Sequence, residues 1–589
     1  MTFSGWLTIF LFVALVTGLA MPLGLYMAAV YSDEHTFMDP LFRVPERLLY
    51  KLLRIDPDKQ QDWKAYAKSL IIFSLAGWLL LYLILRTQTL WNFTGLNPQK
   101  FHSGTWDVTF NTTSSFLTNT NWQYYGGETT MSYFSQMAGL TVQNFLSAGV
   151  GIAVAVALIR GIVSRSGIGI GNFWHDLVRT VLWVLTPISI VVALVLVFQG
   201  SIQNFSHYLT PTGPTGLGNQ IAMGPVASQE AIKLLGTNGG GFFNVNSAHP
   251  FENPSGFASF VEMLTVLLIP AALVFMYGQL TGKRRQGYAI YSPMMIMFLG
   301  AAIVAYVAEA HGSPAQHLAG LHTHVIAGST GGNLEGKEQR FGVAGTALYD
   351  VVTTVTSCGA VNGAIESFTG IGGAVPMANL SASEVIFGGV GTGLYSILLY
   401  VLLAVFLGGL MVGRTPEYLG KKIEAREIKL VAIGLLITPL AALLATALAV
   451  ASRAGRASIS AAATGPQGFS ESFYTYLSQA NNNGSAFAGY GGYVQPNPGN
   501  LGAHGIKFAD LLGGFVMMLA RYAPILFALA VAGSLAGKRI SPPGLGTMRT
   551  DNPTFVVLLI GVIVLVGALT FFPALLLGPI VQGLTTHLY

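Results

Sequence analysis

Ten long apolar runs constrain the fold of this chain more than any other feature of its sequence. They cover Phe3–Val30 and about 67–86, 137–160, 176–199, 258–280, 289–310, 383–411, 428–451, 511–536 and 554–577. A helix needs roughly 20 apolar residues to cross the bilayer core, and the runs have about that length or more. Only 9% of the residues are charged, whereas soluble proteins carry about 25%. The sequence therefore predicts an all-α polytopic membrane protein with about ten transmembrane helices in the lipid bilayer.

Two kinds of connection alternate between the runs. Long polar connections, rich in Gly, Asn, Ser and Thr, cover about 87–136, 200–257, 311–382 and 452–510. The other connections are short and basic, as at Lys283, Arg284 and Arg285. Since Lys and Arg concentrate in short cytoplasmic loops, we expect the long connections and the N-terminus outside the cell. The formal charge of +5 is thus a topology signal, and we expect no nucleic-acid partner.

An amphipathic segment, Pro45–Arg54, follows the first run. Its leucines fall on one helical face and its basic residues on the other; they are Leu48, Leu49, Leu52 and Leu53 against Arg47, Lys51 and Arg54. This pattern suits a helix lying in the cytoplasmic membrane interface. A small packed loop helix explains it equally well.

Four short stretches rich in Gly and Asn recur at nearly one spacing. They are Thr118–Asn121, Gly236–Gly241, Thr356–Gly359 and Asn481–Gly484, one in each long connection. Counted from 121 to 239, 359 and 484, they lie 118, 120 and 125 positions apart. Asn121 stands where the others have glycine, and Asn tolerates left-handed backbone angles. One such stretch is usually a turn, but four at one period indicate an internally repeated protein.

A short helix-length segment precedes each stretch. These segments are Trp106–Leu117, Ala227–Leu235, Thr346–Val355 and Ser470–Gln479, which are too short and too polar to cross a bilayer. We therefore expect four pseudo-symmetric helix–pore loop–helix repeats. The expected division is 1–66 with the first transmembrane helix and a cytoplasmic loop, pore repeats at 67–165, 166–285, 286–425 and 426–540, and a C-terminal transmembrane helix at 541–589.

The chemistry of the four stretches points to a monovalent cation. Irregular backbone at membrane depth must be buried in protein or line an aqueous cavity. Free carbonyls, and helix C-termini worth about −0.5 charge each, would converge on one axis. The core triplets contain no Asp or Glu, whereas Mg²⁺ would recruit carboxylates or keep its waters. Side-chain oxygens of Thr120, Thr237, Ser357 and Asn482 fit the same large cation. These residues alone do not decide between potassium and sodium.

The four stretches with their flanks resemble the filter segments of a known family. Asn119–Gln123, Gly236–Gly241, Ser357–Asn362 and Asn481–Ser485 are similar to those of the KdpA family, the potassium-translocating subunits of Kdp potassium-transporting P-type ATPases. The resemblance covers essentially the whole chain, including Gly413–Lys422. It implies a K⁺-channel-like pore of the superfamily of K⁺ transporters in a bacterial plasma membrane. It also implies a tunnel to the ATP-hydrolysing subunit KdpB, and two smaller subunits, KdpC and KdpF, in a heterotetrameric complex.

The resemblance also implies which residues bind K⁺. They are Asn119, Thr120, Asn121, Gln123, Thr237, Asn238, Gly239, Ser357, Cys358, Gly359, Asn482, Asn483 and Gly484. Gln123 either lines the filter entrance or caps the first stretch. Cys358 contributes its backbone, and its thiol is expected to be a packing group. As the single cysteine, it excludes an intrachain disulfide and a multi-cysteine metal site.

Further residues are candidates for the ion pathway. Glu384 begins the seventh run, Arg521 lies in the middle of the ninth, and Arg414 follows the seventh. A charge at the centre of a membrane helix costs roughly 2.5–3.5 kcal/mol, so it needs a partner or water. Glu384 would draw cations inward and Arg521 would divert them sideways. The alternatives are an interhelical ion pair for these two and a plain topology signal for Arg414.

Glycines interrupt the seventh run. They are Gly388, Gly389, Gly391 and Gly393, and each costs a helix about 1 kcal/mol relative to alanine. A broken helix here suits a gate or tunnel wall, whereas close helix packing through small residues is the alternative. At the outer mouth, Asp107, Asp350 and Glu366 would either concentrate cations or be ordinary solvated charges.

Several activities are excluded or less favoured. The chain has neither a G-x-x-x-x-G-K-[ST] nor an Asp-Lys-Thr-Gly sequence, so it does not itself couple ATP and we expect no cofactor besides K⁺ as substrate. A stand-alone potassium transporter of the same superfamily is the nearest rival. A membrane scaffold would leave four oxygen-rich re-entrant segments without purpose, and inverted-repeat transporters use discontinuous spans at the midplane instead.

Overall fold

The computed structural model describes residues 1–165, 167, 169–213, 216, 218, 220–326, 329–459, 465–487, 490, 503–542, 544 and 547–585. Side chains of 503–506 are not described. The sequence suggests that the outer loop at 493–504 is longer than in the KdpA family. Residues 493–502 of this loop lie outside the described residues.

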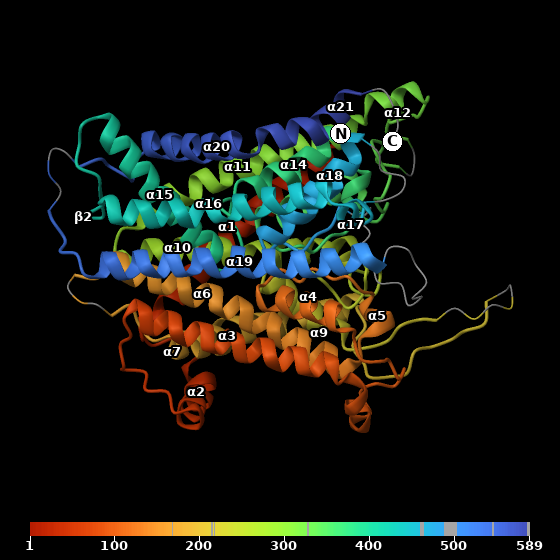
Figure 1. Ribbon diagram of the computed structural model, residues 1–589, viewed down its shortest axis with the longest axis horizontal. Helices are drawn as coiled ribbons and strands as arrows, with labels where there is room; N and C mark the ends of the chain where they lie inside the picture. The colour runs from red at the N-terminus through yellow and green to blue at the C-terminus, as the bar shows by residue number, and fades with distance from the viewer. Residues whose placement is uncertain are drawn as a thin grey trace.

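Ten helices in the described part of the chain are long and apolar enough to cross a membrane. They run side by side along the long axis of the molecule (Figure 1). They are α1 (Phe3–Tyr31), α3 (Trp63–Arg86), α6 (Val142–Val163), α7 and α8 (Phe173–Arg179 and Thr186–Gln199) as one span, α10 (Gly256–Leu280), α11 (Arg284–His311), α15 (Thr392–Met411), α16 (Ala425–Ala451), α19 (Ala503–Ala536) and α20 (Pro553–Leu575). The prediction of an all-α membrane protein with ten spans is confirmed.

Short elements complete the structure. Single π-helical turns, Ser135–Thr141 and Thr180–Leu185, lead into α6 and join α7 to α8, and another, Leu576–Ile580, follows α20. The remaining helices and strands are α2 (Asp39–Leu53), α5 (Gly127–Thr130), α12 (Pro314–Leu318), α14 (Gly370–Ser381), α17 (Arg453–Arg456), α21 (Val581–Leu584), β1 (Glu417–Tyr418) and β2 (Lys421–Lys422), with 3₁₀ turns at Gln88–Thr94, Asn246–Ala248 and Ile365–Ser367.

Four short helices lie among the spans. They are α4 (Trp106–Leu117), α9 (Val226–Leu235), α13 (Gly342–Val355) and α18 (Gly465–Ala480). Each has 10 to 16 residues, fewer than the roughly 20 a spanning helix needs. Each ends at one of the four Gly/Asn stretches, as the sequence predicts. Span, short helix and span therefore follow one another four times along the chain.

The spans differ in how deeply they are buried in the protein. In α6 and α10, 83% and 78% of the most apolar window is buried, against 28% in α1, α3 and α20. α6 and α10 therefore form the centre of the bundle, while α1, α3 and α20 cover it and leave leucines and valines exposed. Such an exposed apolar surface is expected where helices face lipid.

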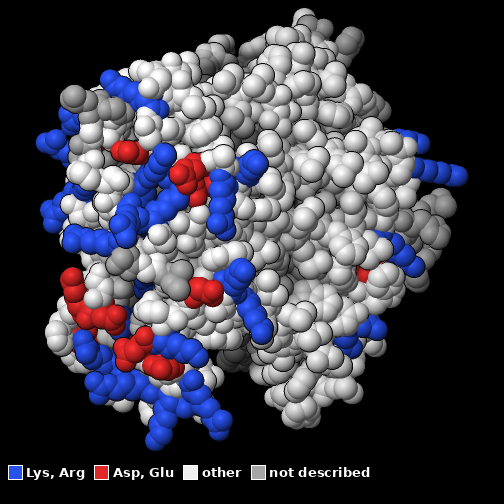
Figure 2. Space-filling model, turned by 60° about the vertical axis from the view of Figure 1, so that its left-hand side comes forward, with Lys and Arg blue, Asp and Glu red and all other residues white. Residues whose placement is uncertain are grey.

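Basic side chains gather at one end of the molecule. Figure 2 shows Lys and Arg concentrated there, separated by a broad uncharged surface from the opposite end. The hairpin of β1 and β2 lies at this end, where Lys421 pairs in register with Tyr418. The Lys421 Nζ donates to the carbonyl oxygens of Gly161 and Leu535 at 2.9 and 2.6 Å. The hairpin thus ties α6 and α19 together at the basic end.

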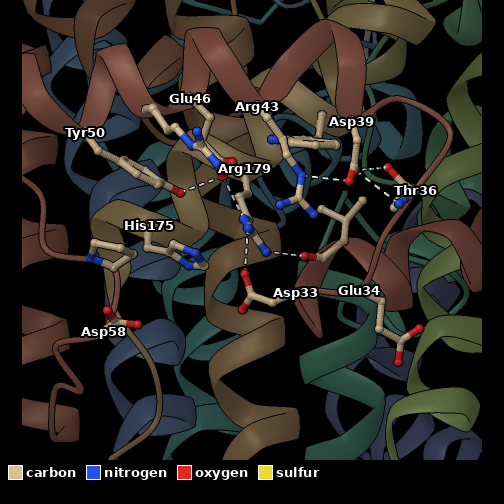
Figure 3. A pocket seen from close by; sticks show the side chains of 14 residues that line it. Asp33, Glu34, Thr36, Asp39, Arg43, Glu46, Tyr50, Asp58, His175 and Arg179 are labelled. Atoms are coloured by element: carbon tan, nitrogen blue, oxygen red, sulfur yellow. Dashed lines mark hydrogen bonds and ion pairs between the residues drawn. The ribbon is translucent and has the colours of Figure 1, made fainter.

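The amphipathic helix α2 lies at the edge of the bundle (Figure 1). Arg179 of α7 anchors it through an ion pair with Glu46 at 2.8 Å, and also pairs at 2.6 Å with Asp33 in the turn before α2, beside a cavity of about 270 Å³ (Figure 3). Leu48 and Leu52 on its other face are exposed. One face of α2 is therefore packed, while the exposed leucine face favours the interfacial alternative.

Candidate functional site

The four Gly/Asn stretches meet in one ring, which we call the carbonyl ring and define as residues 119–121, 237–240, 357–359 and 482–484. At four glycines, the space that a Cβ atom would occupy is already filled by a carbonyl oxygen of a neighbouring stretch. Gly240 meets Asn121, Gly239 meets Cys358, Gly359 meets Asn483, and Gly484 meets Thr120. The contacts join the first stretch to the second, the second to the third, the third to the fourth, and the fourth back to the first. The ring is closed.

Side-chain hydrogen bonds join the same neighbours. Asn119 Nδ2 donates to the Thr237 carbonyl at 3.0 Å, Cys358 Sγ to the Asn238 carbonyl at 3.1 Å, Asn483 Nδ2 to the Thr353 carbonyl at 2.9 Å, and Asn482 Nδ2 to Thr120 Oγ1 at 2.9 Å. The Cys358 thiol, expected to be a packing group, is therefore also a link between the third and second stretches. The side chains hold the stretches in position, with backbone carbonyl oxygens lying against glycines of the neighbouring stretches.

Each short helix ends in the same way. The residue after its cap is left-handed: Asn119 (φ 69°), Thr237 (48°), Ser357 (50°) and Asn482 (50°). The next N–H then bonds back to the carbonyl five residues earlier, in Thr120, Asn238, Cys358 and Asn483 at 2.8–3.0 Å. This is the left-handed helix cap that glycine usually makes. Left-handed Thr and Ser cost of order 1–3 kcal/mol each and cluster at functional sites.

A cavity of about 430 Å³ opens on one side of the carbonyl ring. All four stretches contribute to its lining, through Asn121, Gly240, Gly359 and Gly484. Gln123 also lines it and bonds both backbone groups of Gly241, donating to its carbonyl at 3.1 Å and accepting from its N–H at 2.9 Å. Gln123 therefore lines the cavity and links the first two stretches.

The glycine-rich segment lies directly against the ring. The Val390 N–H donates to Thr237 Oγ1 at 2.8 Å, and the Gly388 N–H donates to the Val355 carbonyl at 2.8 Å. Gly391 (φ 87°) packs so closely on Gly151 of α6 that a Cβ would collide with that backbone. Gly389 and Gly393 belong to the same packed segment. Close packing through small residues is observed, at the position where the sequence suggests a gate.

The predicted start of the seventh span, at 383, is wrong. α14 ends at Ser381 and α15 begins at Thr392, with irregular backbone between them. Ser383 and Glu384 have left-handed angles of 57° and 58°, which a helix cannot contain. Glu384 thus lies in the break before the span rather than in its first turn.

The two intramembrane charges, Glu384 and Arg521, do not form the ion pair that is the alternative to their expected roles in the ion pathway. Arg521 is 4% exposed, and its Nη1 donates to Thr392 Oγ1 at 2.7 Å. In the described part of the chain no acidic side chain forms an ion pair with Arg521. Arg521 therefore braces the start of α15. Arg414 is exposed beyond the end of α15.

Two acidic residues expected near the outer mouth are buried. Asp107 in α4 and Asp350 in α13 are 5% and 4% exposed, and Glu366 is half-buried. The alternative that Asp107 and Asp350 are solvated charges is wrong, because the short helices that carry them lie inside the bundle.

The comparisons with known proteins identify the family. A family model described as "KdpA: Potassium-transporting ATPase A subunit" matches residues 10–584. The chain belongs to the KdpA family. It is 50% identical to a "Potassium-transporting ATPase potassium-binding subunit" of Granulibacter bethesdensis, over 99% of each chain. It is 49% identical to the protein of the same name from Mesorhizobium japonicum, also over 99% of each.

A solved structure is also similar to this KdpA-family chain. It is the potassium transporter TrkH of Vibrio parahaemolyticus, with a TM-score of 0.48 and 14% sequence identity. The similarity covers 88% of this chain and 97% of that one.

Sequence reasoning missed a set of buried charges behind the second stretch. They are Glu230, Lys233, Glu252 and Glu262. These charges could have been found from the opposite charges at 230 and 233, because residues three positions apart lie on the same face of the short helix expected there. Among the described residues of this KdpA-family chain, no cluster of His, Cys, Asp and Glu could hold a metal ion.

Proposed function

We propose that this chain is the K⁺-binding and K⁺-translocating subunit of an ATP-driven potassium uptake system. The closed carbonyl ring is the observation that carries the proposal. A ring of backbone oxygens replaces the hydration shell of a large monovalent cation. The names of the relatives, which are potassium-binding subunits, favour K⁺ over Na⁺, a choice that the residues leave open.

In this proposal the ring is a selectivity filter and the cavity of about 430 Å³ is its outer vestibule. The ring residues of the predicted site, from Asn119 to Gly484, supply the oxygens, and Gln123 lies at the entrance. Buried amide and hydroxyl groups behind the ring hold the four stretches together through the hydrogen bonds described above. The four pore repeats at 67–165, 166–285, 286–425 and 426–540 surround it.

Beyond the ring, the glycine-rich segment at 388–393 is the gate. It is bonded to the ring through Thr237, so a movement of this segment changes the ring's inner end. Glu384 attracts the cation as it leaves the ring. The fixed charge of Arg521 blocks a straight path to the cytoplasm and diverts the ion into a lateral tunnel. Arg414 lies at the cytoplasmic end, where it either fixes the orientation of the chain in the membrane or contacts the ATPase subunit.

The proposed partners are the P-type ATPase subunit KdpB and the smaller subunits KdpC and KdpF. The basic end of the molecule (Figure 2) faces the cytoplasm, and the vestibule and N-terminus face outward, by the positive-inside rule. The complex then lies in the bacterial inner membrane. A stand-alone transporter is the competing proposal, and stable co-purification with an ATPase distinguishes the two.

The first test is Gly239→Asp in the purified complex. The space for a side chain at Gly239 is filled by carbonyl oxygens of Cys358 and Asn483, at 2.8 and 2.9 Å from a Cβ. The substitution must displace these oxygens. We expect the K⁺ concentration for half-maximal ATPase stimulation to rise by about tenfold or more, comparable to losing a hydrogen bond to a charged group. K⁺/Rb⁺ discrimination should fall with it.

Gly95→Asp is the matched control, because it adds the same charge to a long connection where a Cβ meets nothing within 4 Å. We expect K⁺ stimulation to be unchanged there. Unchanged affinity and selectivity in assembled Gly239→Asp complex would refute the filter assignment. Absence of any co-purifying ATPase would favour the stand-alone transporter.

A further inference from the structure

We propose that Lys233 is a positioning residue that holds the second stretch of the carbonyl ring out of register with the other three and thereby sets the ring's cation selectivity. This inference rests on the proposed function, since it assigns a role within the same ring. Lys233 lies on α9, the short helix that leads into the second stretch. Its side chain is 1% exposed.

The ammonium of Lys233 has a full set of acceptors. Its Nζ donates to the Gly240 carbonyl at 2.6 Å and to Asn246 Oδ1 at 2.6 Å, and it pairs with Glu230 Oε2 at 2.8 Å. A lysine ammonium has three donors, so each is used. Hydrogen bonds from a charged donor are roughly twice as strong as neutral ones. The Gly240 carbonyl is therefore fixed in direction.

The second stretch departs from the fourfold pattern at this carbonyl. In the other three stretches the second left-handed residue comes two positions after the first, at Asn121, Gly359 and Gly484. In the second stretch it comes three positions after Thr237, at Gly240 (φ 71°). The carbonyl at the shifted position accepts a bond from the ammonium. The outer end of the ring is thus asymmetric, and Lys233 holds the asymmetry.

A buried positive charge beside a cation site would repel the cation unless it were balanced. Carboxylates surround Lys233. Glu230 Oε1 accepts from Ser247 Oγ at 2.6 Å, and Glu252 Oε1 accepts from the Phe242 N–H at 2.8 Å. A Cβ atom on Gly241 would lie 2.8 Å from Glu252 Oε1 and 3.0 Å from the Lys233 Nζ, so both charged groups flank this glycine. Lys233 can therefore act through geometry without opposing a K⁺ ion in the ring.

The experiment compares Lys233→Met with Lys337→Met in the full purified complex. Lys337 is a close match, because its buried ammonium pairs with Glu309 at the same 2.8 Å. Its other contacts are the Glu335 carbonyl at 3.2 Å and the Phe368 ring, none of them in the carbonyl ring. Both substitutions leave a buried carboxylate unpaired, so their effects on stability should be similar.

We expect Lys233→Met to raise the K⁺ concentration for half-maximal ATPase stimulation by about tenfold, the effect of one lost charged hydrogen bond. The ratio of the Rb⁺ and K⁺ values should change as well. Lys337→Met should leave both quantities as in the unmodified complex. The double variant Lys233→Met with Glu230→Gln removes both charges of the pair and should show the same shift with less loss of stability.

Unchanged K⁺ affinity and Rb⁺/K⁺ ratio in the Lys233 variants would overturn the inference, as would an equal shift in Lys337→Met. Failure of both Lys233 variants to assemble, while Lys337→Met assembles, would also overturn it, because Lys233 would then serve folding alone. Gly239→Asp separates the two proposals. If it shifts K⁺ affinity and Lys233→Met does not, only this inference fails, whereas no shift in either variant removes the proposed function.

Discussion

Two glycines with positive φ angles show what a missing Cβ does at the scale of a residue. Gly391 has φ 87° and Gly413 has φ 67°, both in the left-handed region. A Cβ on Gly391 would collide with the Gly151 backbone, whereas one on Gly413 would meet nothing within 4 Å. Gly391 therefore serves a close approach of the glycine-rich segment to α6, and Gly413 serves only a turn.

Alanine substitution at Gly391 and Gly413 separates the cost of a positive φ angle from the cost of a steric collision with the neighbouring backbone. Gly413→Ala should lower the free energy of unfolding by only about 1 kcal/mol, the cost of placing an alanine at a left-handed φ angle. Gly391→Ala must also push the segment off α6, so we expect a lower thermal midpoint and a clear loss of K⁺-stimulated ATPase activity. Thermal unfolding and ATPase assays of the purified complex measure both. Equal effects of the two substitutions would contradict the close-packing account.

Sequence reasoning worked for residue type better than for residue geometry. It selected the ring residues because Gly, Asn and Thr in register indicate exposed backbone oxygens. It did not foresee that Thr237 and Ser357 adopt left-handed angles of 48° and 50°, since neither residue favours them. Lys233 was missed because a lysine in a short polar segment is usually solvated. Its burial depends on acceptors that the chain brings together only on folding.

At the scale of elements, the anchoring of α2 depends on one side chain of α7. Arg179 Nε and Nη2 bind Glu46 and Asp33, and its Nη1 donates to the Val30 carbonyl at 2.5 Å (Figure 3). Glu46 is buried and also accepts from Tyr50 at 2.7 Å. Removing the arginine leaves this carboxylate without its cation, which is costly inside a protein.

We expect Arg179→Met to release α2 from the bundle. Trypsin should then cleave at Arg47, Lys51 and Arg54 about tenfold faster or more, because a lost charged hydrogen-bond network favours local opening. Arg43→Met is the control, since Arg43 contacts Asp39 of α2 itself at 2.7 Å and His35 just before α2 at 3.2 Å, and neither residue belongs to α7. The cleavage rate of the purified complex is measured for both variants. Equal rates would show that apolar packing alone, such as Phe42 on Trp183, holds α2.

The ends of helices were predictable where a capping sequence coincides with a change from apolar to Gly- and Asn-rich composition. The end of each short helix is marked by a Gly/Asn stretch, and the sequence places it within one residue of the observed position in all four. The seventh span failed because Val385, Ile386 and Phe387 extend its apolar run toward the N-terminus. Hydropathy does not distinguish a buried irregular segment from a helix. Phe387 in this segment has a left-handed φ of 66° and packs against Tyr291 and Phe298 of α11.

At the scale of the whole molecule, the carbonyl ring is a product of assembly. Three of its contacts join consecutive stretches, such as Gly239 with Cys358, and the fourth joins Gly484 near the end of the chain to Thr120 near its start, so the ring closes only when all four repeats are in place. The fourfold period in the sequence predicts four similar repeats. That the four stretches meet on one axis follows from a separate argument, because irregular backbone in a membrane must be buried in protein or line a cavity. The order of contacts around the ring and the asymmetry at Gly240 come only from the structure.

Locating a cation in the complex tests the central claim most directly. Rb⁺ resembles K⁺ and scatters X-rays anomalously, so crystals of the complex grown with Rb⁺ reveal its position. The account predicts an anomalous peak enclosed by the carbonyl oxygens of all four stretches, and its loss in Gly239→Asp crystals. Rb⁺ bound elsewhere in the bundle, with the carbonyl ring empty at saturating Rb⁺, would contradict it.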